Sequence, residues 1–318
     1  MKAVLQYRAS AGFRDALARL TPEWLQIAVV EEADKAGFID TMQDAEVLLH
    51  VLEPVTAEVI ARAPTLRLIQ KIGVGLNTID LEAARARGIA VANMPGTNSQ
   101  AVAELTLSLM FAALRRVPYL DRETRAGRGW QLPGDAFDRM GEIGGRTVGL
   151  IGYGEVPRRL APVLAALGAR VVYTSRSPKV DAIGEAVTLT ELLSVADIVS
   201  LHVPLTSATD KLVNARTLAQ MKRGSVLINT ARGGLIDEDA LIAALGSGHI
   251  RAAALDVFGE EPATAQHPLH ARDNVVITPH VAWLTPETLQ RSLGVAVENC
   301  RRLVEREPLL HEVIPERR

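Results

Sequence analysis

The sequence predicts an α/β protein with two doubly wound parallel sheets. Short apolar segments alternate with helical patterns through most of the 318 residues, which predicts parallel sheets with helices on both faces. The segments of the second half are apolar almost throughout, as is typical of strands buried on both sides. A glycine turn joins a strand to a helix near residue 152, and the first half has no equivalent, so we expect two different domains.

The first domain is predicted from five strands with helical patterns between them: Ala3–Tyr7, Ile27–Val30, Val47–Val51, Leu66–Ile72 and Ile89–Ala92. After the fourth strand, Gly73 and Gly75 bracket Val74 at the edge of the sheet where ligands usually bind. Exposed N–H groups in such a loop can hold a carboxylate. Taken alone, the loop fits better as a tight turn capped by Asn77 or Thr78.

Two crossovers are predicted between the domains. Pro95 and Gly96 break the chain before a long helix that begins near Ser99, and residues 118–145 are polar and glycine-rich, with no assigned helix or strand. A last helix over residues 285–305 has Thr285 as N-cap, followed by a proline, and leads back to the first domain. We therefore expect one domain from 1–98 and 285–318, and an inserted domain from 99–284.

The inserted domain opens with a strand, a glycine turn, a helix and a second strand over residues 146–177. This unit holds a dinucleotide pyrophosphate: Gly152 permits the turn, Gly154 allows close approach of the phosphates, and the helix N-terminus offers free N–H groups. Pro157 replaces the third glycine of the usual fingerprint, and the first helical turn tolerates a proline there. An ordinary glycine turn is the alternative interpretation.

The tip of the second strand favours NADP over NAD. An acidic residue usually occupies this position and bonds the ribose 2′-hydroxyl. This chain has Ser175 and Arg176 there, and small hydroxyls beside an arginine suit a 2′-phosphate.

Three later strands end in reactive side chains: Arg232, Glu261 and His280. Parallel strands collect such ends along one edge of a sheet. Histidine exchanges protons near neutral pH, a carboxylate favours its charged form, and arginine binds a carboxylate in two bonds. Beside a nicotinamide, this set reduces a 2-keto acid. Taken individually, Arg232 is explained equally well as a surface arginine, Glu261 as a helix or turn carboxylate, and His280 as a capped strand end.

Composition excludes several classes of protein. With 48% hydrophobic residues and a net charge of −2, nothing favours a nucleic acid or an anionic membrane as partner. Cys300 is the single cysteine, so neither an intramolecular disulfide nor a cysteine metal cluster is expected, and we assign no metal site. No signal peptide or membrane span is evident, so we expect a cytoplasmic protein.

In these motifs the chain resembles the D-isomer-specific 2-hydroxyacid dehydrogenases, close to the glyoxylate/hydroxypyruvate reductase branch. The matching stretches run nearly end to end: KIGVGLNTID, NSQAVAELTLSLM, VGLIGYGEV, LHVPLT, MKRGSVLINTARGGLIDEDAL, AALDVFGEEP and TPHVAW. The resemblance implies a Rossmann domain inserted in a smaller, flavodoxin-like substrate domain. It also implies closure between the domains and a homodimer joined through the nucleotide domain.

The same resemblance implies roles for individual residues. Arg232 anchors the substrate, His280 donates or accepts the proton with Glu261 as its partner, and the Val74–Gly75 backbone binds the substrate carboxylate. The resemblance further implies that Glu155 and Val156 face the pyrophosphate of the cofactor and that Pro204 and Thr206 line the cofactor cleft. By the same resemblance, Thr230 and Ala231 lie near the nicotinamide ribose or amide, and Asp256 bonds the carboxamide. Trp283 borders the substrate pocket, although a core aromatic is a credible alternative.

The sequence therefore predicts an NAD(P)-dependent 2-hydroxyacid dehydrogenase that reduces glyoxylate, hydroxypyruvate or a related small 2-keto acid to the D-2-hydroxy acid. A dinucleotide-sensing regulatory protein on the same fold is one alternative. Oxidation of another small anion, such as phosphite, is a second.

Overall fold

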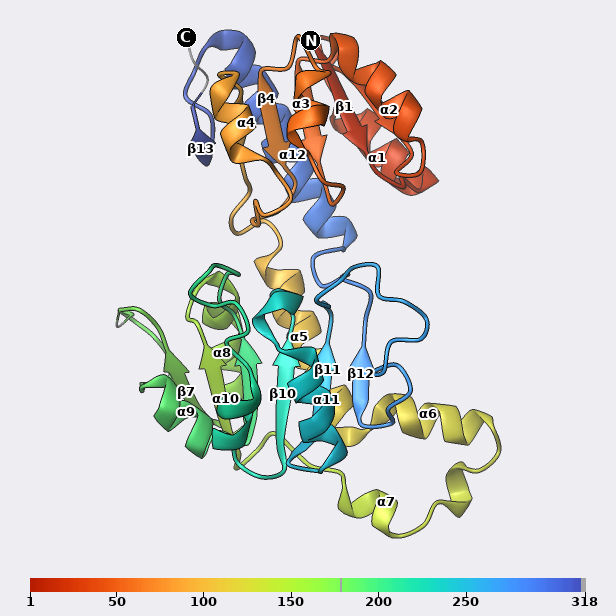
Figure 1. Ribbon diagram of the computed structural model, residues 1–318, viewed down its shortest axis with the longest axis vertical. Helices are drawn as coiled ribbons and strands as arrows, with labels where there is room; N and C mark the ends of the chain where they lie inside the picture. Colours follow the sequence, from red (N-terminus) through yellow and green to blue (C-terminus); the bar gives the residue numbers. More distant parts are fainter. Residues whose placement is uncertain (178, 316–318) are drawn as a thin grey trace. The chain divides into compact units, whose positions relative to one another are not determined.

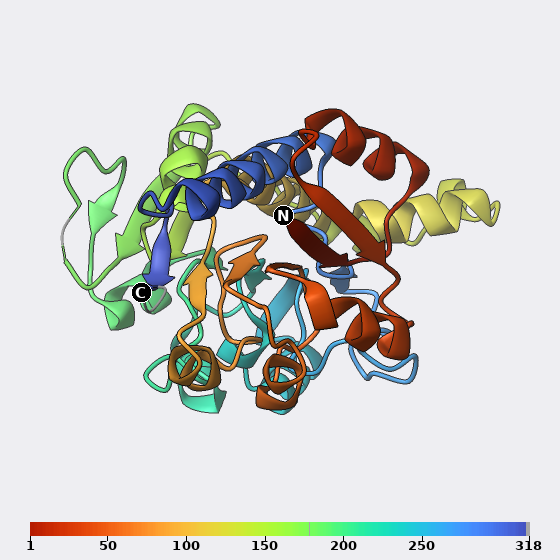
Figure 2. The ribbon, with the colours of Figure 1, turned by 90° about the horizontal axis from the view of Figure 1, so that it is seen from above.

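The computed structural model describes residues 1–177 and 179–315. The chain divides into two compact units. Unit 1 comprises Met1–Asn98 and the described part of Leu284–Arg318, and unit 2 comprises Ser99–Trp283. The last three residues of the expected segment 285–318 lie outside the described residues. Each unit is an α/β layer structure with its own sheet (Figures 1 and 2).

The sheet of unit 1 has the strand order β13-β5-β4-β3-β1-β2. Its first five strands pair in parallel in the flavodoxin-like order 2-1-3-4-5, and β13 adds an antiparallel edge. The strands are β1 (Lys2–Gln6), β2 (Gln26–Val30), β3 (Val47–His50), β4 (Leu68–Lys71), β5 (Ala90–Ala92) and β13 (Glu312–Ile314). The helices are α1 (Ala11–Leu20), α2 (Lys35–Thr41), η1 (Met42–Asp44), α3 (Ala57–Ala61), α4 (Leu81–Ala86) and α12 (Pro286–Glu305).

Helices cover both faces of this sheet. A buried cluster that includes Phe38, Ile60 and Ala84 packs α2, α3 and α4 onto one face, while α1 and α12 lie against each other and α12 also contacts β4. Thr285 caps α12 by accepting the Thr288 N–H, and proline follows it, as predicted.

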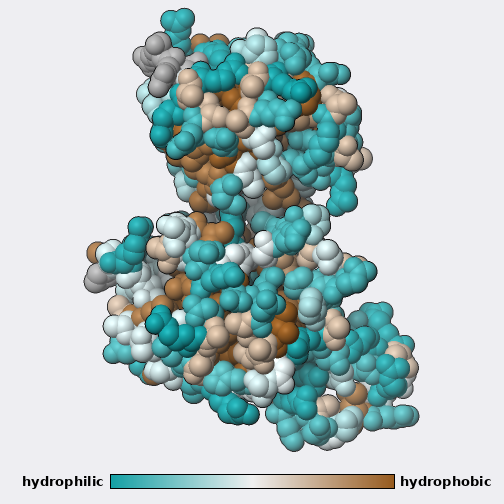
Figure 3. Space-filling model, in the orientation of Figure 1, coloured by the Kyte–Doolittle hydropathy of each residue, from teal (hydrophilic) through white to brown (hydrophobic). Residues whose placement is uncertain are grey.

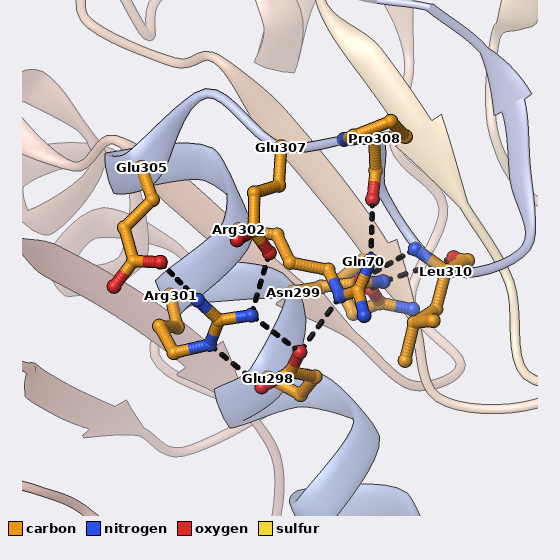
Figure 4. A network of polar contacts seen from close by, with 9 residues as sticks. All are labelled: Gln70, Glu298, Asn299, Arg301, Arg302, Glu305, Glu307, Pro308 and Leu310. Atoms are coloured by element: carbon orange, nitrogen blue, oxygen red, sulfur yellow. Dashed lines mark hydrogen bonds and ion pairs between the residues drawn. The ribbon is translucent and has the colours of Figure 1, made fainter.

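Polar contacts fasten α12 to the rest of unit 1 (Figure 4). The buried side-chain amide of Asn299 donates to Oε1 of Gln70 at 2.5 Å and to the Leu310 carbonyl at 3.1 Å, and its oxygen accepts the Leu310 N–H. Arg301 meanwhile pairs with three carboxylates, those of Glu298, Glu305 and Glu307. Residues from opposite ends of the chain therefore form one core.

The sheet of unit 2 has the order β12-β11-β10-β9-β6-β7-β8, and every pair is parallel. Its strands are β6 (Thr147–Ile151), β7 (Arg170–Thr174), β8 (Glu185–Ala186), β9 (Ile198–Leu201), β10 (Ser225–Asn229), β11 (Ile250–Leu255) and β12 (Val275–Ile277). Its helices are α5 (Ser99–Arg115), α6 (Val117–Arg125), η2 (Gly129–Gln131), α7 (Asp135–Asp138), α8 (Glu155–Ala166), α9 (Leu189–Val195), α10 (Ala215–Gln220), η3 (Gly233–Leu235) and α11 (Glu238–Gly246).

Two hydrophobic clusters cover the two faces of the unit 2 sheet. One packs α5 and α8 onto it through residues such as Met110 and Leu164, and the other packs α9, α10 and α11 through residues such as Leu192 and Leu241. The order of the strands reverses between β6 and β9, which is the point where doubly wound sheets bind ligands. The predicted fold class, two doubly wound sheets with a Rossmann unit inserted in the chain, is confirmed.

The segment over α6, η2 and α7, which we call the arm, was described from the sequence only as polar and glycine-rich. It contains two helices and extends away from the sheet of unit 2 (Figure 1). Its polar residues are compatible with a helix because charges pair one turn apart, as Asp121 does with Arg125. Hydrophilic residues cover most of the visible surface in Figure 3. Among the described residues, no helix combines the length and apolar character of a membrane span.

Candidate active site

The carboxyl ends of β10, β11 and β12 lie side by side in unit 2, since these strands are consecutive neighbours in the sheet. Arg232 follows β10, Glu261 lies in the loop after β11, and His280 follows β12. The parallel arrangement therefore brings the three loops together, although 48 residues separate the first side chain from the last (280 − 232).

The imidazole of His280 is bonded to the carboxylate of Glu261. Its Nδ1 lies 2.6 Å from Oε2 of Glu261, and the other carboxylate oxygen accepts the Phe258 N–H at 2.9 Å. Burial raises the pKa of Glu261, but the hydrogen bonds from His280 and Phe258 and the nearby charges, including Arg232, outweigh burial and leave it below its usual range. The carboxylate is therefore ionised at neutral pH and fixed in direction.

Asp256 organises the loop that carries His280. Its buried carboxylate accepts the Thr278 hydroxyl at 2.5 Å and the N–H groups of Val281 and Ala282, both at 2.9 Å. Its carbonyl oxygen accepts the His280 N–H at 2.7 Å. Burial raises the pKa of Asp256, and these hydrogen bonds act in the opposite direction. Sequence reasoning assigned Asp256 to the cofactor and missed this role, because the partners follow a different strand.

His280 itself adopts a left-handed backbone conformation, with φ of 54°. Residues other than glycine rarely adopt it, and such strain clusters at functional sites. The indole Nε1 of Trp283 donates to the His280 carbonyl at 3.1 Å, so this tryptophan supports the same turn from inside unit 2.

The loop after β10 presents Arg232. The buried amide of Asn229 accepts the Ala231 N–H and donates to the Arg232 carbonyl, which fixes the turn. The guanidinium donates to the Ala231 carbonyl at 2.6 Å, and its remaining N–H groups bond no other described residue. Burial lowers the pKa of Arg232 and the charge of Glu261 opposes that shift. At Gly233, a Cβ would lie 1.8 Å from the Phe258 carbonyl oxygen, so only glycine allows the two loops to meet.

The glycine turn after β6 has the properties of a phosphate site. Gly152 has φ of 99°, and a Cβ there would lie 2.5 Å from the His202 carbonyl oxygen at the end of β9. A Cβ at Gly154 would meet no atom within 4 Å, so the space beside it is open. No side chain caps α8, and the N–H groups of Glu155 and Val156 precede the first helical bond, from Arg158 to Gly154.

Pro157 is the third residue of α8 and is buried. The helix continues through it because a residue at this position has no helical acceptor to lose. The substitution removes one N–H from the helix N-terminus and leaves those of Glu155 and Val156. These residues fit the pyrophosphate of a dinucleotide.

At the end of β7, the Ser175 hydroxyl donates to the Ser177 carbonyl at 2.5 Å. Arg176 is exposed, and its guanidinium bonds no other residue in the described part of the chain. The two side chains predicted to select the cofactor thus lie in a short surface turn, with one cation available for an anionic group.

The other predicted cofactor residues lie at the ends of β9 and β10. Pro204 and Thr206 are exposed in a turn held by the Thr209 hydroxyl, which donates to the Pro204 carbonyl at 2.6 Å. The Thr230 hydroxyl is buried and lies 2.8 Å from that of Thr106 on α5, so it supports the edge of the sheet, while Ala231 next to it is half-buried.

The loop after β4 belongs to unit 1. Its carbonyls at Gly73 and Val74 accept the Met94 N–H and the Asn93 amide, whereas the N–H groups of Val74 and Gly75 bond no other backbone group among the described residues. These two N–H groups can donate hydrogen bonds to an anion.

The buried ammonium group of Lys71, at the end of β4, precedes this loop and was not predicted from the sequence. The Lys71 ammonium bonds the Val51 carbonyl and lies 3.2 Å from Nδ1 of His50, whose Nε2 lies 3.3 Å from the Thr78 hydroxyl. Burial and then the charge of Lys71 lower the pKa of His50 to about 3. No local pattern signals such a pair, because its members come from different strands.

No group of three or more histidine, cysteine, aspartate or glutamate side chains in the described ranges is arranged to hold a metal ion.

The model of the D-isomer specific 2-hydroxyacid dehydrogenase NAD-binding domain matches residues 107–282. The chain is 40% identical over 265 residues to a glyoxylate reductase of Aeropyrum pernix, covering 81% of this chain and 79% of that protein. The chain belongs to the D-isomer-specific 2-hydroxyacid dehydrogenase family. A hydroxypyruvate reductase of Thermotoga maritima is also similar, with 37% identity over 83% of this chain and 86% of its own length.

Solved structures of the family share the fold. The TT0316 protein of Thermus thermophilus superposes with a TM-score of 0.89 at 38% identity, covering 99% of this chain and 100% of that one. A formate dehydrogenase of Staphylococcus aureus in complex with NAD has a TM-score of 0.88 at 27% identity, with 98% of each chain covered. An acyclic imino acid reductase in complex with NADPH and D-Arg has a TM-score of 0.84 at 27% identity, covering 98% and 100%.

This dehydrogenase is therefore an oxidoreductase of the glyoxylate/hydroxypyruvate reductase type, with a domain for a nicotinamide dinucleotide between residues 107 and 282. The family acts on small 2-hydroxy and 2-keto acids.

Proposed function

We propose that the protein reduces glyoxylate, hydroxypyruvate or a similarly small 2-keto acid to the D-2-hydroxy acid, with NADPH favoured over NADH. The observation that carries this proposal is the 2.6 Å bond between His280 and Glu261 at the strand end next to Arg232. It supports the proposal because a histidine, a carboxylate and an arginine then lie at the ends of neighbouring strands in unit 2.

Each residue has a role in this reaction. The bound dinucleotide supplies a hydride to the carbonyl carbon. Because Nδ1 of His280 is bonded to Glu261, Nε2 is the atom that gives its proton to the carbonyl oxygen. Arg232 has N–H groups that bond no other described residue, and in this proposal they bind the substrate carboxylate. In unit 1, the proposed substrate domain, the N–H groups of Val74 and Gly75 are the groups proposed to bind a carboxylate.

The proposed dinucleotide contacts follow the edge of unit 2. Gly152, Gly154, Glu155 and Val156 form the pyrophosphate site, supported by the open space at Gly154 and the uncapped helix. The remaining contacts along the edge are those of Pro204, Thr206, Thr230, Ala231 and Asp256, and Trp283 borders the substrate.

The test of the reaction is the absorbance of the reduced nicotinamide with purified protein and each keto acid. Turnover that is lost in His280→Ala, while dinucleotide binding by fluorescence is kept, supports the proposal. Tight binding without turnover on a wider panel of keto acids would instead favour the dinucleotide-sensing alternative, and turnover with phosphite alone would favour the other.

NADP is the favoured cofactor because Arg176 is an exposed cation with no described partner, beside Ser175 instead of a carboxylate. Replacing Arg176 with alanine should raise the KM for NADPH and leave that for NADH nearly unchanged. Equal effects on both constants contradict this assignment.

We further propose that two copies of the chain associate through the arm. Large hydrophobic side chains are exposed there: Trp130 is 94% exposed, Phe137 53% and Val117 51%. An interface covers such residues. Sedimentation velocity should show a dimer that Trp130→Glu converts to a monomer, while Val180→Glu, at an exposed position outside the arm, leaves it intact. A wild-type monomer contradicts the proposal.

A further inference from the structure

A second carboxylate lies behind Glu261. Glu238 is the first residue of α11, directly after the N-cap Asp237. Its Oε1 accepts the Gly259 N–H at 2.9 Å, and its Oε2 lies 3.3 Å from Nε2 of His267. The side chains of Glu238 and His267 are only 23% and 18% exposed. Glu238 therefore bonds two points of the loop that carries Glu261.

The first of these points is the peptide that directs Glu261. The Phe258 N–H donates to Glu261, and the next N–H along the chain, that of Gly259, donates to Glu238. The carbonyl of Phe258 faces Gly233, the neighbour of Arg232, with no room for a Cβ between them. The peptide group between Phe258 and Gly259 is thus held at its oxygen by the Arg232 loop and at its nitrogen by Glu238.

The second point is His267, near the far end of the same loop. Its Nδ1 accepts the Leu269 N–H at 3.4 Å, so Nε2 carries the proton that is donated to Glu238. The His267 ring also meets the Phe258 ring edge-on, with 5.3 Å between the ring centres. Both ends of the loop are consequently tied to one carboxylate.

We propose that Glu238 is a positioning residue for the Glu261–His280 pair, an inference that rests on the proposed keto-acid reduction. Without Glu238, the Phe258–Gly259 peptide loses its restraint, and the Phe258 N–H no longer fixes the direction of the Glu261 carboxylate. The imidazole then loses the partner that aligns it. Dinucleotide binding is unaffected, because none of these residues is among the proposed dinucleotide contacts.

The kinetic test compares three variants. Glu238→Ala removes both bonds, and we expect kcat for keto-acid reduction to fall at least about tenfold, since small displacements of catalytic groups have effects of this size. The KM for the dinucleotide should not change. Glu238→Gln keeps an acceptor for Gly259 and should restore most of kcat.

The matched control is Glu191→Ala. Glu191 also lies in the first turn of a helix, α9, and accepts a backbone N–H, that of Thr188, at 2.9 Å. Its removal should weaken the helix cap and leave kcat as in the wild type. If Glu238→Ala behaves like this control, the inference is wrong.

A spectroscopic readout separates this inference from the proposed function. The imidazole N–H proton bonded to Glu261 should give a far-downfield proton resonance, assigned by its loss in His280→Ala. Glu238→Ala should shift or abolish it, whereas Glu238→Gln and Glu191→Ala keep it. An unshifted resonance in Glu238→Ala overturns the role of Glu238, even if the wild type reduces no keto acid and the proposed function has failed.

Discussion

Nδ1 of His280 and Oε2 of Glu261 are 2.6 Å apart, the separation of a charge-assisted hydrogen bond. The two residues follow neighbouring strands, and a backbone N–H and a buried aspartate hold their loops. The bond fixes which imidazole nitrogen faces the carboxylate, and it leaves Nε2 for proton exchange.

Glu261→Gln should keep an acceptor for the Phe258 N–H while removing the charge beside His280. Reduction requires the protonated imidazole, and a carboxylate stabilises that form. We therefore expect kcat/KM to fall by about tenfold or more. Initial rates measure this fall, and an unchanged kcat/KM contradicts the role given to the Glu261 charge.

Gly233→Ala should destabilise the protein by about 3 kcal/mol and abolish activity, because its Cβ would overlap the Phe258 backbone. Gly234→Ala is the control: its Cβ would lie 2.9 Å from the end of the Leu205 side chain, which can move. Urea denaturation compares the two. Equal stability of the variants would show that the loops do not meet as described.

Gly152→Ala and Gly154→Ala should fail in different ways. Alanine at 152 meets the His202 carbonyl in a left-handed conformation, so the free energy of unfolding should fall by about 1–3 kcal/mol. Alanine at 154 meets nothing, so stability should stay normal while dinucleotide affinity falls. Thermal melts and fluorescence titrations separate the two effects, and normal affinity in Gly154→Ala argues against a phosphate at this position.

Ser175→Asp should reverse the cofactor preference. A carboxylate here repels a 2′-phosphate and accepts the hydroxyl of an unphosphorylated ribose. We expect the KM for NADPH to rise at least about tenfold, equivalent to about 1.4 kcal/mol, and that for NADH to fall. Ser194→Asp, at an exposed position on α9, should change neither constant. If Ser175→Asp also changes neither KM, the turn after β7 does not contact the ribose.

His50 should make unit 1 sensitive to acid. Burial and Lys71 lower its pKa from 6.5 to about 3 in the folded protein, so between these values only the unfolded chain binds the proton. Stability is therefore lost as pH falls through this window, by up to about 1.4 kcal/mol per pH unit. His50→Asn should reduce this slope in urea denaturation, whereas His311→Asn, at an exposed histidine, should not. Identical slopes for all three proteins contradict the prediction.

The fold was predictable from sequence because local signals and the global arrangement agree. Apolar strands, the glycine turn and the cap at Thr285 each act over a few residues, and all of them indicate the same layers. The strand ends that carry Arg232, Glu261 and His280 were also predictable, since parallel strands bring their ends to one edge.

Contacts between different loops were not predictable in this way. The family resemblance assigned Asp256 to the cofactor, and the hydrogen bonds that its carboxylate accepts from the loop around His280 were not predicted. Glu238 and the Lys71–His50 pair gave no signal, because their partners are fixed only once the chain has folded. The helices of the arm were missed because the charged residues that pair along them give the segment the polar composition of a loop.

The attachment of α12 to Gln70 sets an order of assembly during protein synthesis. Residues 1–98 leave the ribosome before Asn299 is synthesised. Until then, α12 can cover neither the side-chain amide of Gln70 nor its face of β4. The dinucleotide unit is continuous in sequence and can complete its core while the last helix is still being made. The portion synthesised first is therefore finished last.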